Sequence, residues 1–175
     1  LLDRSIRHRG PDGQGRFRDR ARRADGSTAT VAMVHRRLSI LDHAGGAQPM
    51  LIRGEDAGGA MTINAGDGAA APLLFHGSPN SAVDYRPLEA APADRLAIVF
   101  NGCIYNHREL RKELAAAGHT FTTDHSDTEV IPHEWRRNRW RLLDILEGMY
   151  AAAIWDAAEG AVALMRDRFG EKPLY

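Results

Sequence analysis

The amino-acid sequence predicts an α+β fold, and three observations support this prediction. Short β-prone runs recur along the chain, segments with helical spacing separate only some of these runs, and no internal repeat is visible. A strict alternation of strands and helices, which would predict a parallel sheet, is therefore not present. With 175 residues, of which 43% are hydrophobic, the chain is long enough to bury the core of one domain.

Charge and composition exclude several classes of function. Because 23 basic side chains balance 23 acidic ones, no net positive charge is available to neutralise nucleic-acid phosphates. No apolar run reaches the ~18–20 residues of a membrane span, and no segment has the form of a signal peptide. Cys103 is the only cysteine, and the histidines lack metal-binding spacing. We therefore expect a cytoplasmic protein that holds no metal in this chain and binds neither nucleic acid nor membrane.

The N-terminal part is expected to contain a turn, a polar stretch and two strands. Residues 10–13 (GPDG) predict a turn, because proline fixes φ and glycine tolerates positive φ. The arginine-rich residues 16–23 are expected to form a solvated face or a loop. Residues 30–34 (TVAMV) and 38–41 (LSIL) are β-prone, and we expect them to pair with each other, with the polar residues 35–37 between them.

The middle of the chain predicts a buried strand followed by a helix. Residues 96–100 (LAIVF) form a continuous apolar run, which is typical of a buried strand, and this run ends in the turn dipeptide Asn101-Gly102. Asn106 is expected to cap the next helix, which ends at Gly118.

A second helix and two strands are expected to follow. Residues 126–129 (SDTE) have the form of a capping box, which predicts the start of a helix. Pro132 would remove a backbone hydrogen bond inside that helix, so we expect either a kink or a late start. Residues 150–155 and 160–166 are expected to be strands, joined by a turn at residues 156–160.

We expect residues 1–175 to form one domain that carries a long insertion. Residues 53–94 are rich in glycine, alanine and proline, with four of the eight prolines and six glycines. Such a composition buries too little apolar surface to become fully ordered, which predicts a surface insertion. The sequence begins without methionine and ends at Tyr175 without a polar tail, so we expect a domain that is truncated at both ends.

Polar residues beside the expected strand ends predict a ligand-binding site. Since arginine binds carboxylates and aspartate binds ammonium groups, Arg37 and Asp127 could hold the two charged ends of an α-amino acid. The Asn101 side chain and the Gly102 N–H could both donate to one oxygen, as in an oxyanion hole. Simpler alternatives stay open: Arg37 in a surface ion pair, Asp127 at a helix N-terminus, and Asn101-Gly102 as a plain turn. A thiol after a buried strand, such as that of Cys103, is more typical of a small core residue than of a nucleophile.

Seven motifs occur in an order that resembles the N-terminal glutaminase domain of glutamine-hydrolysing asparagine synthetases. They are HRGPDGQG (8–15), HRRLSILD (35–42), QPM (48–50), NGCIYNHRELR (101–111), SDTEV (126–130), GMYAAAIWD (148–156) and RDRFGEKPLY (166–175). Other class II glutamine amidotransferases are similar at NG and SDTE but lack the rest of this combination. The resemblance covers nearly the whole chain outside the insertion.

This resemblance implies the fold and the reaction. The fold would be an N-terminal-nucleophile αββα sandwich, in which two stacked antiparallel sheets lie between helix layers. A cysteine at the mature N-terminus, ahead of Leu1, would attack the side-chain amide of L-glutamine, while Asn101 and Gly102 would hold the oxyanion. The ammonia would pass to a C-terminal synthetase domain, where ATP and Mg2+ activate aspartate. The glutaminase domain itself would need no cofactor. The protein could form a homodimer.

The resemblance also implies how glutamine is bound. Arg37 would pair with its α-carboxylate, and Asp127 would receive its α-ammonium. The family usually has a glutamate at the position of Cys103, and this glutamate helps to bind the ammonium. A neutral thiol cannot supply that charge, so we expect glutamine binding to be weaker by ~1–3 kcal/mol. The backbone that lines the pocket would be that of Leu38, Ser39, Ile40 and Leu41.

Two alternatives to an asparagine synthetase glutaminase stay open. The first is a related amidotransferase that uses another acceptor carboxylate. The second is a degenerate structural domain that does not hydrolyse glutamine, an interpretation that Cys103 favours because it replaces a charged group.

Overall fold

The computed structural model describes residues 5–10, 13–22, 25–37, 48–52, 94–121 and 123–175. The strand predicted at residues 38–41 lies outside these ranges, and so does the predicted insertion at residues 53–94, apart from its last residue.

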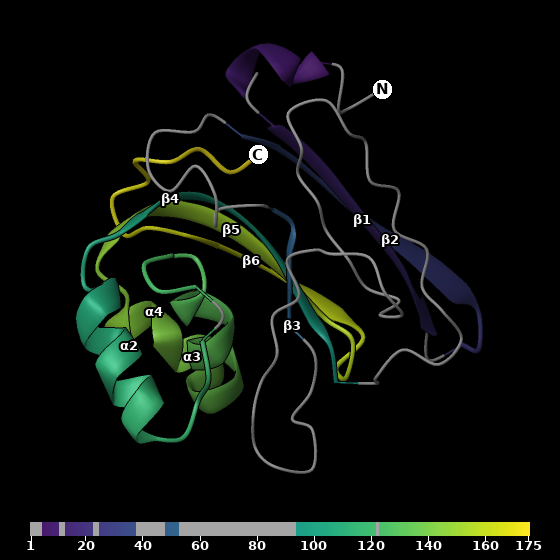
Figure 1. The fold of residues 1–175 in the computed structure, drawn as a ribbon. Helices are drawn as coiled ribbons and strands as arrows, with labels where there is room; N and C mark the ends of the chain where they lie inside the picture. Colours follow the sequence, from purple (N-terminus) through teal and green to yellow (C-terminus); the bar gives the residue numbers. More distant parts are fainter. Residues whose placement is uncertain (1–4, 11–12, 23–24, 38–47, 53–93, 122) are drawn as a thin grey trace.

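Two antiparallel sheets form the centre of the molecule (Figure 1). In the smaller sheet, β1 (Gly13–Arg22) pairs with β2 (Thr28–Arg37) over its whole length. The larger sheet has the order β3-β4-β5-β6, in which every neighbouring pair is antiparallel. Its strands are β3 (Met50–Ile52), β4 (Leu96–Ile104), β5 (Gly148–Asp156) and β6 (Ala161–Arg166).

The larger sheet is covered on both faces. The helices α2 (His107–Ala116), α3 (Val130–Asn138) and α4 (Leu142–Ile145) lie on one face, and the β1–β2 sheet lies across the other (Figure 1). Short 3-10 turns occupy Arg7–Arg9 and Arg139–Arg141. Successive residues of a strand point to opposite faces, so β4 contributes to both layers of the core. Leu96, Ile98 and Phe100 join the cluster beneath the helices, whereas Ala97 packs with Trp155 beneath the smaller sheet.

A buried ion pair joins the two sheets. Asp19 on β1 is 1% exposed and accepts hydrogen bonds from Nε (2.8 Å) and Nη2 (2.7 Å) of Arg95, which directly precedes β4. The indole N–H of Trp155 donates to the same carboxylate at 2.8 Å. Removing one partner of a buried ion pair typically costs about 3–5 kcal/mol, because the other charge is left buried alone. This pair therefore fixes how β1 lies against the larger sheet.

For the arginine-rich residues 16–23, a solvated face or a loop was predicted, and the solvated face is confirmed at Arg18 and Arg20. Residues 16–22 belong to β1, in which Phe17 is buried while Arg18 and Arg20 are exposed. Arg18 and Arg20 thus lie on the solvated face of a strand. Residues 35–37 also belong to a strand, because β2 continues through them opposite β1. They are not a connection between two strands, as the sequence had suggested.

The helices begin and end close to the predicted places. Asn106 precedes α2 as predicted, but its side chain does not cap the helix; it donates to Ile145 O at 2.9 Å and accepts from Glu147 N at 3.1 Å. The helix finishes just before Gly118. The strands predicted at residues 150–155 and 160–166 are confirmed as β5 and β6.

The capping box predicted at residues 126–129 is wrong. Helix α3 starts late, at Val130, which places Pro132 in its first turn, where a missing N–H costs little. No side chain caps the start of α3, because the carboxylate of Glu129 accepts hydrogen bonds from Thr123 instead.

Candidate functional site

Strand β4 continues through the predicted turn. Asn101 pairs with Ala151 and Gly102 with Tyr150, so the strand extends to Ile104 and the prediction of a turn at Asn101-Gly102 is wrong. The glycine is needed here because β5 approaches closely: a Cβ atom on Gly102 would lie 2.1 Å from the carbonyl oxygen of Met149. The Asn-Gly pair therefore serves the packing of two strands and not a reversal of the chain.

Side chains take the place of a neighbouring strand along one edge of β4. Strand β3 pairs with β4 only as far as Ile98. At Phe100, the backbone N–H donates to Oε1 of Gln48 at 2.6 Å. The carbonyl of Phe100 lies 3.2 Å from Nε2 of His35, and because a carbonyl only accepts, this nitrogen is the donor. Gln48 and His35 thus bring two segments that are distant from β4 in the sequence to its edge at Phe100.

Gly102 lies on the same edge, between two residues whose backbone is bound by side chains. Alternate residues of a strand direct their backbone groups to the same edge, so Phe100, Gly102 and Ile104 share it. Ile104 N donates to Oδ2 of Asp127 at 2.9 Å. Within the part of the chain that the structure describes, no strand pairs with Gly102 on this edge. Its N–H can therefore donate to an oxygen atom of a ligand.

Asp127 brings a negative charge to the same end of β4. Its carboxylate contacts both Ile104 N and the thiol of Cys103. Burial raises the pKa of Cys103, and the charge of Asp127 and their hydrogen bond raise it further, whereas Lys172 acts in the opposite direction. A thiol whose pKa is raised stays protonated and is a poor nucleophile. Cys103 is therefore a neutral neighbour of the carboxylate.

The structure brings together some of the predicted site residues. Asn101, Gly102, Cys103 and Asp127 lie at one end of β4, and the Asn101 side chain is exposed there. The predicted residue Arg37 is the last residue of β2, two positions after His35, which reaches Phe100. The side chain of Arg37 and the predicted pocket backbone lie outside the described residues; the latter comprises Leu38, Ser39, Ile40 and Leu41.

A buried carboxylate organises the chain beside Gly102. The backbone N–H groups of four residues donate to Asp167, at 2.9–3.1 Å; they are those of Tyr150, Phe169, Glu171 and Lys172. Burial alone would raise the pKa of Asp167, but these four hydrogen bonds outweigh it and lower the pKa to about 2. Since Tyr150 is the β5 partner of Gly102, Asp167 ties the C-terminal loop to the candidate site.

Sequence reasoning missed the individual roles of several residues at this site. Gln48, His35 and Asp167 stand inside motifs that were recognised, yet nothing in the local sequence shows that their side chains bind backbone groups far away. The same holds for Arg111 and Glu129, which hold the loop of Asp127. Among the described residues, no group of three or more His, Cys, Asp or Glu side chains is arranged to bind a metal ion. Nor is any helix within those ranges long and apolar enough to cross a membrane.

Comparison with known families identifies the class of this domain. Two family models, each described as a glutamine amidotransferase domain, match residues 2–66 and residues 78–175. Since the second match alone spans more than half of the chain, the chain belongs to the glutamine amidotransferase domain family.

Similar proteins include several asparagine synthetases. The chain is 33% identical over 174 residues to asparagine synthetase [glutamine-hydrolyzing] 1 of Bacillus subtilis. The aligned region covers 99% of this chain and 20% of that protein. It is 34% identical over 171 residues to a putative asparagine synthetase [glutamine-hydrolyzing] of Mycobacterium tuberculosis. This alignment covers 97% of the chain and 20% of the relative. The chain thus spans about a fifth of the length of these curated relatives.

A solved structure confirms the predicted fold class. Glutamine phosphoribosylpyrophosphate amidotransferase from B. subtilis superposes with a TM-score of 0.54 and 20% sequence identity, over 92% of this chain and 32% of that one. Together with the two stacked antiparallel sheets, this similarity confirms the α+β N-terminal-nucleophile sandwich. The described residues build both sheets and one helix layer.

Proposed function

We propose that this chain is the glutaminase part of an asparagine synthetase, which hydrolyses L-glutamine and supplies ammonia for the amidation of aspartate. The observation that carries the proposal is the meeting of the Gly102 N–H edge with the carboxylate of Asp127 at one end of β4. One group suits a developing oxyanion and the other suits an ammonium. The names of the relatives support glutamine as the amide donor.

Glutamine would be bound by its charged α-groups. Asp127, whose Oδ2 is fixed by Ile104 N at 2.9 Å, accepts the α-ammonium. Arg37, at the end of β2, pairs with the α-carboxylate, and the backbone of residues 38–41 lines the pocket. Cys103 contributes no charge because its pKa is raised, so Asp127 alone balances the ammonium.

The reaction would proceed through a thioester. A cysteine at the mature N-terminus, outside residues 1–175, attacks the amide carbon of the glutamine side chain as a thiolate. The Asn101 side chain and the Gly102 N–H donate hydrogen bonds to the oxyanion that forms on the amide oxygen. The C–N bond then breaks, the nitrogen takes up a proton, and ammonia leaves. Water hydrolyses the thioester, which yields glutamate and restores the thiol.

The remaining steps would belong to a synthetase domain of the same polypeptide. In this proposal ATP and Mg2+ act there, on aspartate, and residues 1–175 need no cofactor of their own. The whole protein would work in the cytoplasm, with L-glutamine as the ligand of this domain.

Variants of Asn101 test the proposal in the full-length protein that contains these residues. Asn101→Ala should lower glutamate release from L-glutamine by roughly 10²–10³, because one oxyanion donor is lost. Asparagine formation from ammonium, aspartate and ATP should not change, since it bypasses this site. Asn138→Ala, at the C-terminal end of α3, is the control and should leave both activities intact.

Two results would contradict the proposal. The first is a wild-type protein that forms asparagine from ammonium but releases no glutamate from glutamine. The second is an Asn101→Ala variant that loses both activities to the same extent, because Asn101 would then act on the whole fold.

A further inference from the structure

The loop that carries Asp127 is closed on itself by a buried glutamate. Glu129, at the end of this loop, is 0% exposed, and its Oε2 accepts a hydrogen bond from the backbone N–H of Thr123 at 3.0 Å. The hydroxyl of Thr123 donates to the same oxygen and in turn accepts a hydrogen bond from Ser126 N at 3.3 Å. The first and last residues of the segment 123–129 therefore meet at one carboxylate.

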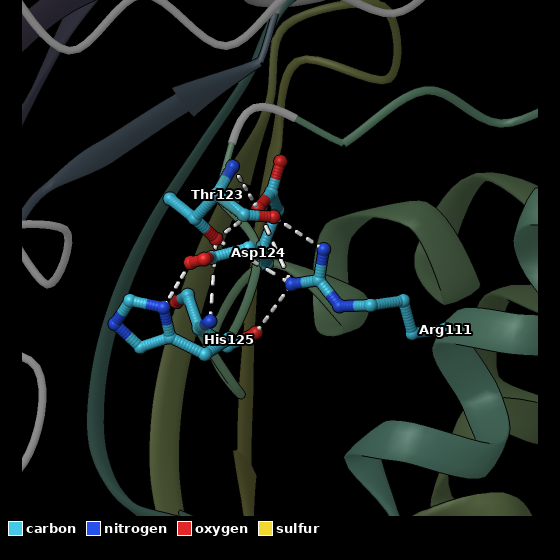
Figure 2. Close-up of polar contacts among 6 residues, drawn as sticks. Arg111, Thr123, Asp124 and His125 are labelled. Atoms are coloured by element: carbon cyan, nitrogen blue, oxygen red, sulfur yellow. Dashed lines mark hydrogen bonds and ion pairs between the residues drawn. The ribbon is translucent and has the colours of Figure 1, made fainter.

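An arginine from α2 fixes this loop from the other side. The guanidinium of Arg111 donates to the carbonyl oxygens of Thr123 and Ser126, the latter at 2.9 Å, and lies 3.5 Å from Oε2 of Glu129. Figure 2 shows the side chain of Arg111 reaching from the helix into the turn formed by Thr123, Asp124 and His125. The guanidinium also stacks over Phe121, 4.1 Å from the ring centroid. One side chain thus binds three points of the loop.

These contacts hold the backbone on both sides of Asp127. Ser126 precedes it and is bound through its carbonyl, while Glu129 follows two residues later and is bound through its carboxylate. Asp127 itself reaches β4, where its Oδ2 accepts the N–H of Ile104 at 2.9 Å. The position of this carboxylate relative to Gly102 therefore depends on the pair formed by Arg111 and Glu129.

The helices do not need this polar pair in order to pack. Leu110 and Leu114 of α2 and Val130 and Ile131 of α3 already lie in the apolar cluster beneath the larger sheet. A buried ion pair adds little stability compared with apolar side chains of the same volume, whereas it can select one geometry. The polar contacts of Arg111 are with the loop and with Glu129, not with the sheet.

We propose that Arg111 and Glu129 are positioning residues of the glutamine site, which set the place of the Asp127 carboxylate at the end of β4. The identity of the ligand rests on the proposed function, but the positioning of Asp127 does not. Neither residue touches the reacting atoms, so their effect should appear in glutamine binding and not in the chemical step.

Arg111→Met and Glu129→Gln in the full-length protein test this inference, because each removes a charge at similar size. Hydrogen exchange, followed by mass spectrometry of peptides that contain Ile104, reports the Asp127 contact without any ligand. We expect exchange at Ile104 to become about tenfold faster, the effect of losing one hydrogen bond. The matched controls are Arg108→Met and Glu113→Gln, which alter exposed residues of the same helix α2 and should leave this exchange unchanged.

Kinetics provide a readout that a purely structural role would not produce. The KM for L-glutamine should rise about tenfold in both variants while kcat stays within about twofold, since binding of the substrate and of the transition state is weakened equally. The double variant should be no worse than either single one, because both residues act through the same loop. Thr123→Val removes only a hydroxyl and should raise the KM for L-glutamine by a smaller factor. This variant tests the inference even if the charge variants fail to fold.

The two proposals fail in different ways. If the wild-type protein does not release glutamate from L-glutamine, the proposed function is wrong, yet the exchange at Ile104 still decides the positioning. If exchange at Ile104 is unchanged in Arg111→Met, Glu129→Gln and Thr123→Val, the positioning inference is overturned. It is equally overturned if kcat and KM deteriorate together with thermal stability.

Discussion

The two halves of strand β4 differ in what surrounds them. Residues Leu96, Ile98 and Phe100 point into the core beneath the helices and are at most 4% exposed. Asn101, Gly102 and Cys103 are more exposed, whereas the last residue, Ile104, is buried again and its backbone N–H donates to the carboxylate of Asp127. One continuous ladder with β5 connects the two halves. A rigid apolar half can therefore hold a polar half in place, which is how binding groups are usually presented by a scaffold.

The contrast yields different expectations for substitutions only a few residues apart. A change in the first half should act on the free energy of unfolding, because it opens the core. A change at Asn101 or Cys103 in the second half should act on glutamine binding, because these two side chains are not fully buried. The predictions below test this division, from the largest expected effect to the smallest.

Ile98→Ala should produce the largest loss of stability. Ile98 is 0% exposed, and its removal leaves a cavity between the sheet and the helices. We expect the free energy of unfolding to fall by about 2–5 kcal/mol, as measured by chemical denaturation. Leu164→Ala on β6, where the side chain is 56% exposed, is the control and should change it little. A loss at Ile98 no larger than that at Leu164 would mean that this half of β4 is not the rigid support.

Low pH should weaken the helix side of the core through His133. This side chain on α3 is buried against His119 and Phe121. Burial, followed by the charges of His119, Arg136 and Arg111, lowers the pKa of His133 from 6.5 to about 3. Between these values the unfolded chain binds a proton that the folded one does not. The free energy of unfolding therefore falls as the pH drops, by at most ~1.4 kcal/mol per pH unit.

Denaturation of His133→Leu across that pH window measures this effect. The slope should become flatter than in the wild type, whereas His8→Leu, which alters an exposed residue of the 3-10 turn Arg7–Arg9, should keep the wild-type slope. If His133→Leu also keeps it, the histidine is not the group that titrates.

Cys103→Glu should have the smallest effect, and the only favourable one. A carboxylate beside Asp127 would restore a second negative charge for the α-ammonium, so the KM for glutamine should fall about tenfold. Asparagine formation from ammonium should not change, and Cys103→Ser should resemble the wild type because it adds no charge. An unaltered KM in Cys103→Glu would place residue 103 away from the substrate.

The apolar part of the fold could be predicted because its signal is local. Residues 96–100 are apolar throughout, since β4 is covered on both faces, and the strands at 150–155 and 160–166 are bounded by clear turn residues. Strand β1 escaped prediction because arginines alternate with Phe17 and Asp19 there. The partner that explains a buried Asp19 is Arg95, which is 76 residues away.

The sequence predicted that some of the candidate-site residues lie together, but not how they are arranged. Asn101, Gly102 and Asp127 were expected near one another, and the structure places them at one end of β4. The local form of the sequence was misleading at two points, however. The Asn101-Gly102 pair suggested a turn, yet the glycine accommodates the close approach of Met149. Glu129 suggested a helix cap, yet its carboxylate binds Thr123. Both errors arise from partners that local sequence does not reveal.

The most direct test of a glutamine site at the end of β4 is calorimetric titration of L-glutamine into the full-length Asp127→Asn protein. An asparagine can still accept the N–H of Ile104, so the fold is kept while the charge is removed. We expect glutamine binding to weaken by at least about tenfold, whereas Asp124→Asn, an exposed carboxylate of the same loop, binds like the wild type. Equal affinity of Asp127→Asn and wild type would contradict a glutamine site at this position.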